Sequence, residues 1–205
     1  MTTASFFIVF DGPEGSGKST QIELLRRRLA DGGREVVLVR DPGTTRIGEK
    51  IRAILLDPAN DEMAMRCEML LYMSARAQMM TEFILPALAA GKTVLCDRFV
   101  SSTLAYQLGG DGMSEGEIRA VAEIAIQGRW PDLTIILDLP AEKSLARVQR
   151  EKDRIEQRPL AYHEQVRQNY LAQARADREK YRVVDADRER AVVHEDVWRI
   201  VREIF

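Results

Sequence analysis

The chain has 205 residues, of which 45% are hydrophobic and 30% charged, with a formal net charge of −2. A chain of this length can bury one substantial core, and its composition excludes a disordered chain and a disulfide scaffold. The charge gives no reason to expect a nucleic-acid or membrane partner, so any positive potential must be local. We therefore expect one globular domain over residues 1–205.

The sequence carries no sign of export or membrane insertion. No apolar run approaches the roughly 18 residues that a membrane span needs. The opening MTTASFF has neither a basic segment nor a signal-type apolar stretch. We expect a cytoplasmic protein. Cys67 and Cys96 have no metal-ligand spacing and are expected to be reduced, buried thiols.

Five short apolar runs rich in β-branched residues alternate with longer helical patterns. The runs are SFFIVF at 5–10, EVVLV at 35–39, TVLC at 93–96, LTIILDL at 133–139 and YRVV at 181–184. This alternation predicts an α/β fold with a parallel sheet. Each run ends in a polar cluster, and ligands of open parallel sheets bind outside the carboxyl ends of the strands. We expect these clusters to converge on one cleft.

The first run leads directly into a phosphate-binding pattern, met by Gly12, Gly17, Lys18 and Ser19. Glycines let the backbone approach phosphate oxygens, and successive N–H groups at a helix N-terminus face the anion. Lys18 should reach the β- and γ-phosphates, and the Ser19 hydroxyl should bind Mg²⁺. We predict that ATP is bound by Gly12, Pro13, Glu14, Gly15, Ser16, Gly17, Lys18, Ser19 and Thr20.

The methionine-rich segment from Glu62 to Ala90 follows the second strand and its polar cluster. Methionine supplies adaptable apolar surface that suits a core or a subunit contact. A role in the core is favoured.

The third run ends in Asp97 and Arg98, which suit joint handling of metal and phosphate. The carboxylate would orient hydrated Mg²⁺, partly through water and together with Ser19, and the guanidinium would bind an acceptor phosphate in a fork. A GTPase would need an Asn-Lys-x-Asp motif and a transport ATPase a Ser-Gly-Gly signature, and the sequence has neither. A small kinase remains.

The chain resembles the thymidylate kinase family of nucleoside monophosphate kinases, in its bacterial type, over nearly its whole length. The motifs that carry the resemblance are GPEGSGKST, RDPGTTRIGEKIR, LLYMSARAQ, DRFVSSTLAYQ, RWPDLTIILDL and DRIEQ. The resemblance implies a P-loop NTPase fold, a three-layer α/β/α sandwich with a five-stranded parallel sheet, helices on both faces and a short lid. It also implies ATP- and Mg²⁺-dependent conversion of dTMP to dTDP for dTTP synthesis, by a homodimer.

The resemblance assigns the acceptor site residue by residue. It implies dTMP binding by Glu14, Asp41, Arg52, Tyr72, Arg76, Arg98, Ser102, Thr103, Tyr106 and Gln107. Glu14 would receive the 3′-hydroxyl, Arg76 would bind the thymine edge, Tyr72 would stack on the base and Tyr106 would favour deoxyribose. Tyr72 and Arg76 are four residues apart and so lie on one helix face.

One loop departs from the family pattern. The family usually has Glu-Pro-Gly-Gly-Thr where this chain has Asp41-Pro42-Gly43-Thr44-Thr45. Asp is one methylene shorter than Glu, and Thr44 cannot take a positive φ as cheaply as glycine. This departure leaves open a kinase for another nucleoside monophosphate or for a nucleoside. A non-catalytic nucleotide-binding regulator is a further alternative.

A charge-rich segment at about 145–160 resembles the family lid. Members of the family differ in whether the loop or the lid supplies the arginine that neutralises charge on the transferring phosphate. This loop has no basic residue at Gly15 or Ser16, so the resemblance implies that the lid supplies it. The order of preference is Arg150, Arg147, Arg154, and a solvated helix face is the alternative interpretation. The predicted catalytic set is Lys18, Asp97, Arg98, Arg150, Arg147 and Arg154. His163 and His194 fall in helical surface contexts and are not expected to act as bases.

Overall fold

The computed structural model describes residues 5–149 and 151–205. Within these residues five strands form one parallel sheet, in the order β2-β3-β1-β4-β5. The strands are β1 (Phe7–Asp11), β2 (Val36–Arg40), β3 (Thr93–Asp97), β4 (Leu133–Asp138) and β5 (Tyr181–Asp185). Each predicted apolar run overlaps one strand, which confirms the predicted sheet.

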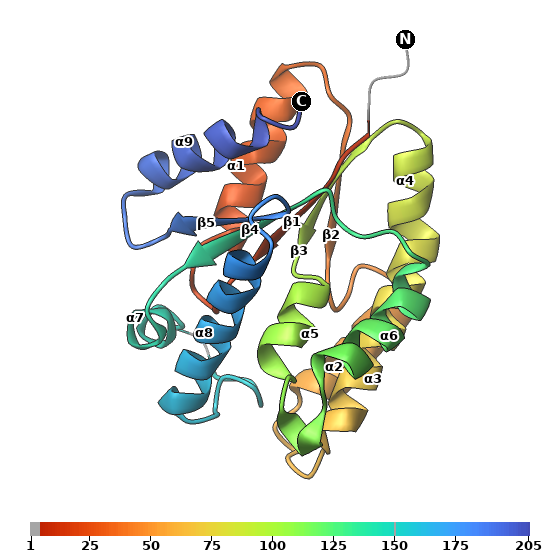
Figure 1. Ribbon diagram of the computed structural model, residues 1–205, viewed down its shortest axis with the longest axis vertical. Coiled ribbons are helices and arrows are strands. Elements are labelled where there is room, and N and C mark those ends of the chain that lie inside the picture. The colour runs from red at the N-terminus through yellow and green to blue at the C-terminus, as the bar shows by residue number, and fades with distance from the viewer. Residues whose placement is uncertain (1–4, 150) are drawn as a thin grey trace.

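Helices cover both faces of the sheet (Figure 1). The α-helices are α1 (Lys18–Asp31), α2 (Arg46–Leu56), α3 (Met65–Met79), α4 (Leu85–Ala89), α5 (Val100–Tyr106), α6 (Glu115–Ile126), α7 (Ala141–Ala146), α8 (Leu160–Ala176) and α9 (Arg190–Val201). A π-helical turn, η1 (Met80–Ile84), joins α3 to α4, and a 3₁₀ turn, η2 (Gly110–Gly112), follows α5. The three-layer α/β/α arrangement is confirmed.

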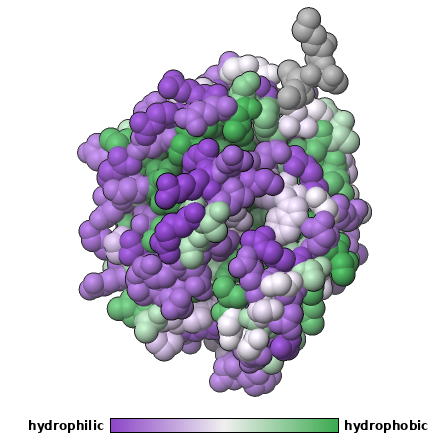
Figure 2. All heavy atoms as spheres, viewed as in Figure 1, coloured by the Kyte–Doolittle hydropathy of each residue, from purple (hydrophilic) through white to green (hydrophobic). Residues whose placement is uncertain are grey.

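The buried strand β1 shows how the two cores form. Successive side chains of a strand point to opposite faces. Phe7 and Val9 pack with α3, α5 and α6, whereas Ile8 and Phe10 pack with α1 and α9. The viewed surface is mostly hydrophilic, with scattered hydrophobic residues (Figure 2). Both apolar layers therefore meet at the central strand.

The methionine-rich segment belongs largely to the first of these cores. Met69, Met73, Met79 and Met80 are buried there, as predicted. The thiol prediction is half wrong: Cys96 is buried in β3, but Cys67 is exposed. Cys67 lies on the side of α3 away from the buried methionines.

The predicted lid, at about 145–160, spans the end of α7 and the start of α8. Its described residues between these two helices contain no α-helix, so the solvated-helix interpretation is wrong there. Arg150 lies outside the described residues. Within the described chain, no helix is both long and apolar enough to cross a membrane.

Candidate active site

The phosphate loop runs from the end of β1 to the start of α1 and surrounds Lys18. The Lys18 ammonium donates to the backbone oxygens of Gly12 at 3.2 Å and Pro13 at 2.8 Å. Burial lowers the pKa of Lys18, and the charge of Arg98 adds to this effect. Gly15 has φ +69°, and a Cβ there would lie 2.7 Å from the backbone oxygen of Ser144. The loop is therefore a tight backbone cradle around one cation.

Ser19 and Asp97 contact each other beside this loop. The Ser19 hydroxyl donates to Asp97 Oδ2 at 3.1 Å, and both residues line the cavity of the phosphate loop. Hydroxyl and carboxylate oxygens are ligands that Mg²⁺ accepts. No group of three or more His, Cys, Asp or Glu side chains in the described residues could hold a metal. A bound Mg²⁺ would therefore need phosphate and water oxygens to complete its shell.

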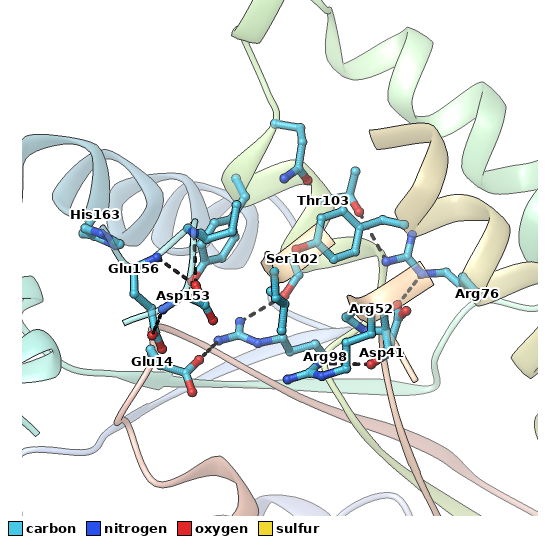
Figure 3. Close-up of a pocket in the computed structure, with 16 residues that line it drawn as sticks. Glu14, Asp41, Arg52, Arg76, Arg98, Ser102, Thr103, Asp153, Glu156 and His163 are labelled. Atoms are coloured by element: carbon cyan, nitrogen blue, oxygen red, sulfur yellow. Dashed lines mark hydrogen bonds and ion pairs between the residues drawn. The ribbon is translucent and has the colours of Figure 1, made fainter. Parts of the chain in front are cut away.

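Arg98 lies between the phosphate loop and a second cavity. It has φ +70°, and its Nη1 donates to the Gly12 oxygen at 3.0 Å and to Ser102 Oγ at 3.2 Å. Its Nη2 donates to Glu14 Oε2 at 2.7 Å, and the bonds to Glu14 and Ser102 are drawn in Figure 3. The side chain is fixed on several sides and lines both cavities.

Arg98 also lies close to a buried carboxylate, Asp11, that the sequence interpretation missed. Asp11, the last residue of β1, accepts hydrogen bonds from Ser101, Ser102 and, at 2.8 Å, the Tyr170 hydroxyl. It lies 3.6 Å from Arg98 Nη1. The only sequence signal was an acid at the end of a buried strand. Tyr170 gave no signal, because it lies 159 residues further along the chain.

The second cavity lies between α3, α5 and residues 153–156 and is lined by aromatic and polar side chains. Its buried cation is Arg76, whose Nε donates to Asp41 Oδ2 at 2.6 Å and whose Nη2 donates to Thr103 Oγ1 at 3.2 Å (Figure 3). Burial raises the pKa of Asp41, and Arg76 opposes that shift. The cavity is also lined by Tyr72, Tyr106 and Gln107. Tyr72 and Arg76 line the same cavity, as their spacing predicted.

The two cavities share Glu14, Asp41, Arg52 and Arg98. Arg52 Nη1 donates to the Pro42 oxygen at 3.1 Å. Burial lowers the pKa of Arg52, and the nearby charge of Arg40 adds to the shift. Guanidinium groups brought together in a partly buried place favour an anion between them. The junction of the two cavities is therefore suited to phosphate.

The loop that departs from the family pattern has a compensating contact. Thr44 does take a positive φ, +67°. Its Oγ1 accepts from the Arg40 N–H at 2.8 Å and donates to the Arg40 oxygen at 3.2 Å, while its own N–H donates to Glu49 Oε1 at 2.9 Å. These bonds hold the strained residue. The shorter Asp41 still reaches Arg76.

Two of the three lid arginines can be placed. Arg147 lies at the phosphate loop, with Nη1 3.4 Å from the Gly15 oxygen, and it lines the phosphate cavity. Arg154 is elsewhere: it is buried, with Nε bonded to the Leu55 oxygen at 2.9 Å and Nη2 paired with Glu68. A buried carboxylate requires a cationic partner, and Arg154 supplies it. The structure thus brings Arg147, and not Arg154, to the loop.

The acceptor-side cavity has further lining residues that the sequence interpretation missed. They are Pro42, Leu56, Asp153, Ile155, Glu156 and His163. The surface prediction is wrong for His163, which is 7% exposed, and burial lowers its pKa. His163, in the first turn of α8, lines this cavity together with Ile155 and Glu156, and helical periodicity alone does not reveal that contact.

Comparison with known proteins identifies the family of the chain. The family model described as thymidylate kinase matches residues 10–197. Among similar curated proteins, a thymidylate kinase of Thermomicrobium roseum is 46% identical and spans 98% of this chain and 96% of its own. One of Pelotomaculum thermopropionicum is also 46% identical and spans 97% and 94%. The crystal structure of a thymidylate kinase from Ehrlichia chaffeensis superposes with a TM-score of 0.75 at 29% identity, over 97% of this chain and 99% of that one.

A shared phosphate loop alone would fit many enzymes, but here the match extends over both cavities and nearly the whole length of the chain. The chain therefore belongs to the thymidylate kinase family.

Proposed function

We propose that this chain transfers the γ-phosphoryl group of ATP to dTMP, with ATP on the phosphate loop and dTMP in the aromatic-lined cavity. The observation that supports this arrangement is the set of side chains common to both cavities, Glu14, Asp41, Arg52 and Arg98. A phosphoryl group passing between the two nucleotides must cross that junction.

On the donor side, the loop from Gly12 to Thr20 holds the ATP phosphates. Lys18 would exchange its two backbone partners for β- and γ-phosphate oxygens. Mg²⁺ would be held by Ser19 and, partly through water, by Asp97, where it would neutralise phosphate charge. The oxygen donors present fit that ion.

On the acceptor side, Tyr72 would stack on the base and Arg76 would donate to its edge. Arg52, Arg98 and Ser102 would hold the 5′-phosphate at the junction, and Tyr106 would pack on the sugar. Glu14, already bonded to Arg98, would accept a hydrogen bond from the 3′-hydroxyl.

The chemical step needs no covalent intermediate. The attacking dTMP oxygen is anionic at neutral pH, so positioning and charge neutralisation carry the catalysis. Arg98 and Arg147, which both line the phosphate cavity, would stabilise the charge on the transferring group. No observation favours another acceptor. A non-catalytic role is not favoured either, because Lys18, Ser19 and Asp97 are all in place.

Replacing Arg147 tests the lid assignment. Arg147→Ala should lower kcat by about tenfold to a hundredfold, because one charge that stabilises the transition state is lost. The KM for dTMP should change little, since Arg147 lines only the phosphate cavity. Steady-state kinetics would check this, with Arg188→Ala on the surface as the control. An unchanged kcat would remove Arg147 from the mechanism and leave Arg150 as the preferred lid arginine.

Replacing Arg76 tests the acceptor assignment. Arg76→Ala should raise the KM for dTMP by about a hundredfold while the KM for ATP stays near wild type, because a buried bond to the base is lost. Removal of Arg76 also leaves Asp41 buried without its cation, so thermal unfolding must be followed in parallel. Wild-type dTMP turnover by folded Arg76→Ala at low acceptor concentration would refute the role of Arg76.

We further propose that residues 1–205 act as one domain, with a lid at about 145–160, in a cytoplasmic homodimer. Exposed apolar side chains on α3 and α6, Leu70 and Ile124, support a subunit contact. Sedimentation velocity would test the dimer, and a monomer at assay concentrations would contradict it.

A further inference from the structure

Glu68 is a buried carboxylate that the proposed mechanism does not use. It lies on α3 with no exposed surface. Its Oε2 pairs with Arg154 and, at 2.9 Å, with Arg158, and both arginines come from the segment that leads into α8. Guanidinium groups can only donate hydrogen bonds, so the Glu68 carboxylate acts as the acceptor in both ion pairs.

The other oxygen of Glu68 determines the orientation of a neighbouring amide. Gln107 Nε2 lies 2.7 Å from Glu68 Oε1. Because the carboxylate can only accept, the amide end that faces it must be the NH₂ group, and the carbonyl Oε1 must point elsewhere. Gln107 is buried and lines the acceptor cavity, and no residue of the described chain donates to its Oε1. A hydrogen-bond acceptor is thus left for a ligand.

Two contacts join α3 to α5 across this cavity. At one, Glu68 accepts from Gln107; at the other, Arg76 donates to Thr103. Glu68, Tyr72 and Arg76 are spaced by four on α3, and Thr103 and Gln107 by four along α5 and its C-terminal end, so each set lies on one helix face. Along this face of α3, Tyr72 comes between Glu68 and Arg76 and lines the same cavity, so a base stacked on it would present its edge toward both contacts.

The Arg76 contact supplies a donor. Nη1 of Arg76 carries two N–H groups, and one of them points to the Met73 sulfur at 3.0 Å. The second has no partner in the part of the chain that the structure describes. The cavity therefore offers a donor from Arg76 and an acceptor from Gln107.

We propose that Glu68 is a positioning residue that, paired with Arg154 and Arg158, fixes the amide of Gln107 so that the cavity selects bases with a carbonyl beside an N–H. This inference rests on the proposed function. Thymine and uracil present O4 beside N3–H, which matches a donor and an acceptor. Cytosine presents an amino group beside an unprotonated nitrogen, which opposes both. Rejection of cytosine thus depends on Glu68, which need not touch the nucleotide.

Glu68→Gln tests this inference, because the new amide can accept or donate and no longer fixes Gln107. The ratio of kcat/KM for dTMP to that for dCMP should fall by about tenfold or more, since mispaired polar groups in a buried site no longer penalise cytosine. The ratio for dTMP to dUMP should stay at the wild-type value, since both bases share the same edge. Glu68→Asp, which keeps the carboxylate, should keep the discrimination against dCMP.

A purely structural role for Glu68 predicts a different result. In that case Glu68→Gln would lower kcat/KM for dTMP, dUMP and dCMP in parallel, and this outcome would overturn the inference. An unchanged dTMP-to-dCMP ratio in folded enzyme would do the same.

In Glu68→Gln, Arg154 and Arg158 lose the carboxylate that pairs with them, and this loss could prevent folding. A second variant avoids that problem. Glu68→Met with Arg154→Met removes the buried acid and its buried partner together, a kind of exchange that proteins often tolerate. The same fall in the dTMP-to-dCMP ratio is expected, and an unchanged ratio would overturn the inference. Wild-type enzyme that fails to phosphorylate dTMP would contradict the proposed function, whereas normal wild-type activity with unchanged selectivity in the variants would contradict only the role of Glu68.

Discussion

Lys18→Met should reduce dTDP formation by about 10³-fold, because the charge that holds the β- and γ-phosphates in the cradle is lost. The ammonium is buried and, in the described chain, donates only to backbone oxygens of the loop, so it forms no ion pair that would compete with the phosphates. Binding of dTMP alone should stay close to wild type, since Lys18 lines the phosphate cavity and not the acceptor cavity. Steady-state turnover and calorimetric titration with dTMP measure the two effects separately.

A matched control is Lys92→Met. Lys92 precedes β3 and pairs with Glu35 at 2.8 Å, at the end of the sheet away from the loop. It should retain wild-type turnover. Activity of Lys18→Met within a factor of about ten of wild type would contradict the role of the loop lysine.

Arg98→Lys should lower kcat by about a hundredfold or more and also raise the KM for dTMP, because Arg98 lies at the junction of both cavities. Its guanidinium donates to Gly12, Ser102, Tyr170 and Glu14 at once. An ammonium cannot reproduce that fork, so the conservative change should not rescue activity. Steady-state kinetics with each substrate varied in turn would show the two effects.

The control for this variant is Arg119→Lys on α6, whose ion pair with Glu115 is largely exposed. It should behave as wild type, because exposed pairs contribute little. A fall in kcat for Arg98→Lys without any change in the KM for dTMP would contradict a role of Arg98 on the acceptor side.

The sequence predicted those features that depend on local pattern. Apolar β-branched runs predicted each strand, because such residues favour extended backbone, both in the buried strands β1, β3 and β4 and in the half-exposed edge strands β2 and β5. The phosphate loop was predictable from a short spacing, since its chemistry depends on consecutive backbone groups. The shared face of Tyr72 and Arg76 followed from helical periodicity.

Features that depend on distant pairing could not be predicted in this way. Asp11 and Tyr170, or Glu68 and Arg154, are far apart in sequence, and burial of their charged or polar groups becomes evident only once the chain is folded. The charged residues at about 145–160 are typical of a solvent-exposed segment, yet the side chain of Arg154 is buried. Buried charge needs a partner, but sequence does not identify which one.

The loop at Thr44 shows both outcomes in one place. The sequence predicted that Thr44 would pay a conformational cost at this position, and Thr44 does take a positive φ. Its relief by the bonds to Arg40 and Glu49 was not predictable, because it depends on the return of α2 toward the end of β2.

The central claim is that this chain phosphorylates dTMP in preference to other deoxynucleoside monophosphates. The most direct measurement is ADP release from Mg-ATP in the presence of dTMP, dUMP, dCMP, dAMP or dGMP, with the nucleoside diphosphate product identified by chromatography. We expect dTMP to give the highest kcat/KM and dTDP to be the product. Turnover of dUMP or dCMP as fast as dTMP, or ATP binding without ADP release for any acceptor, would contradict the claim.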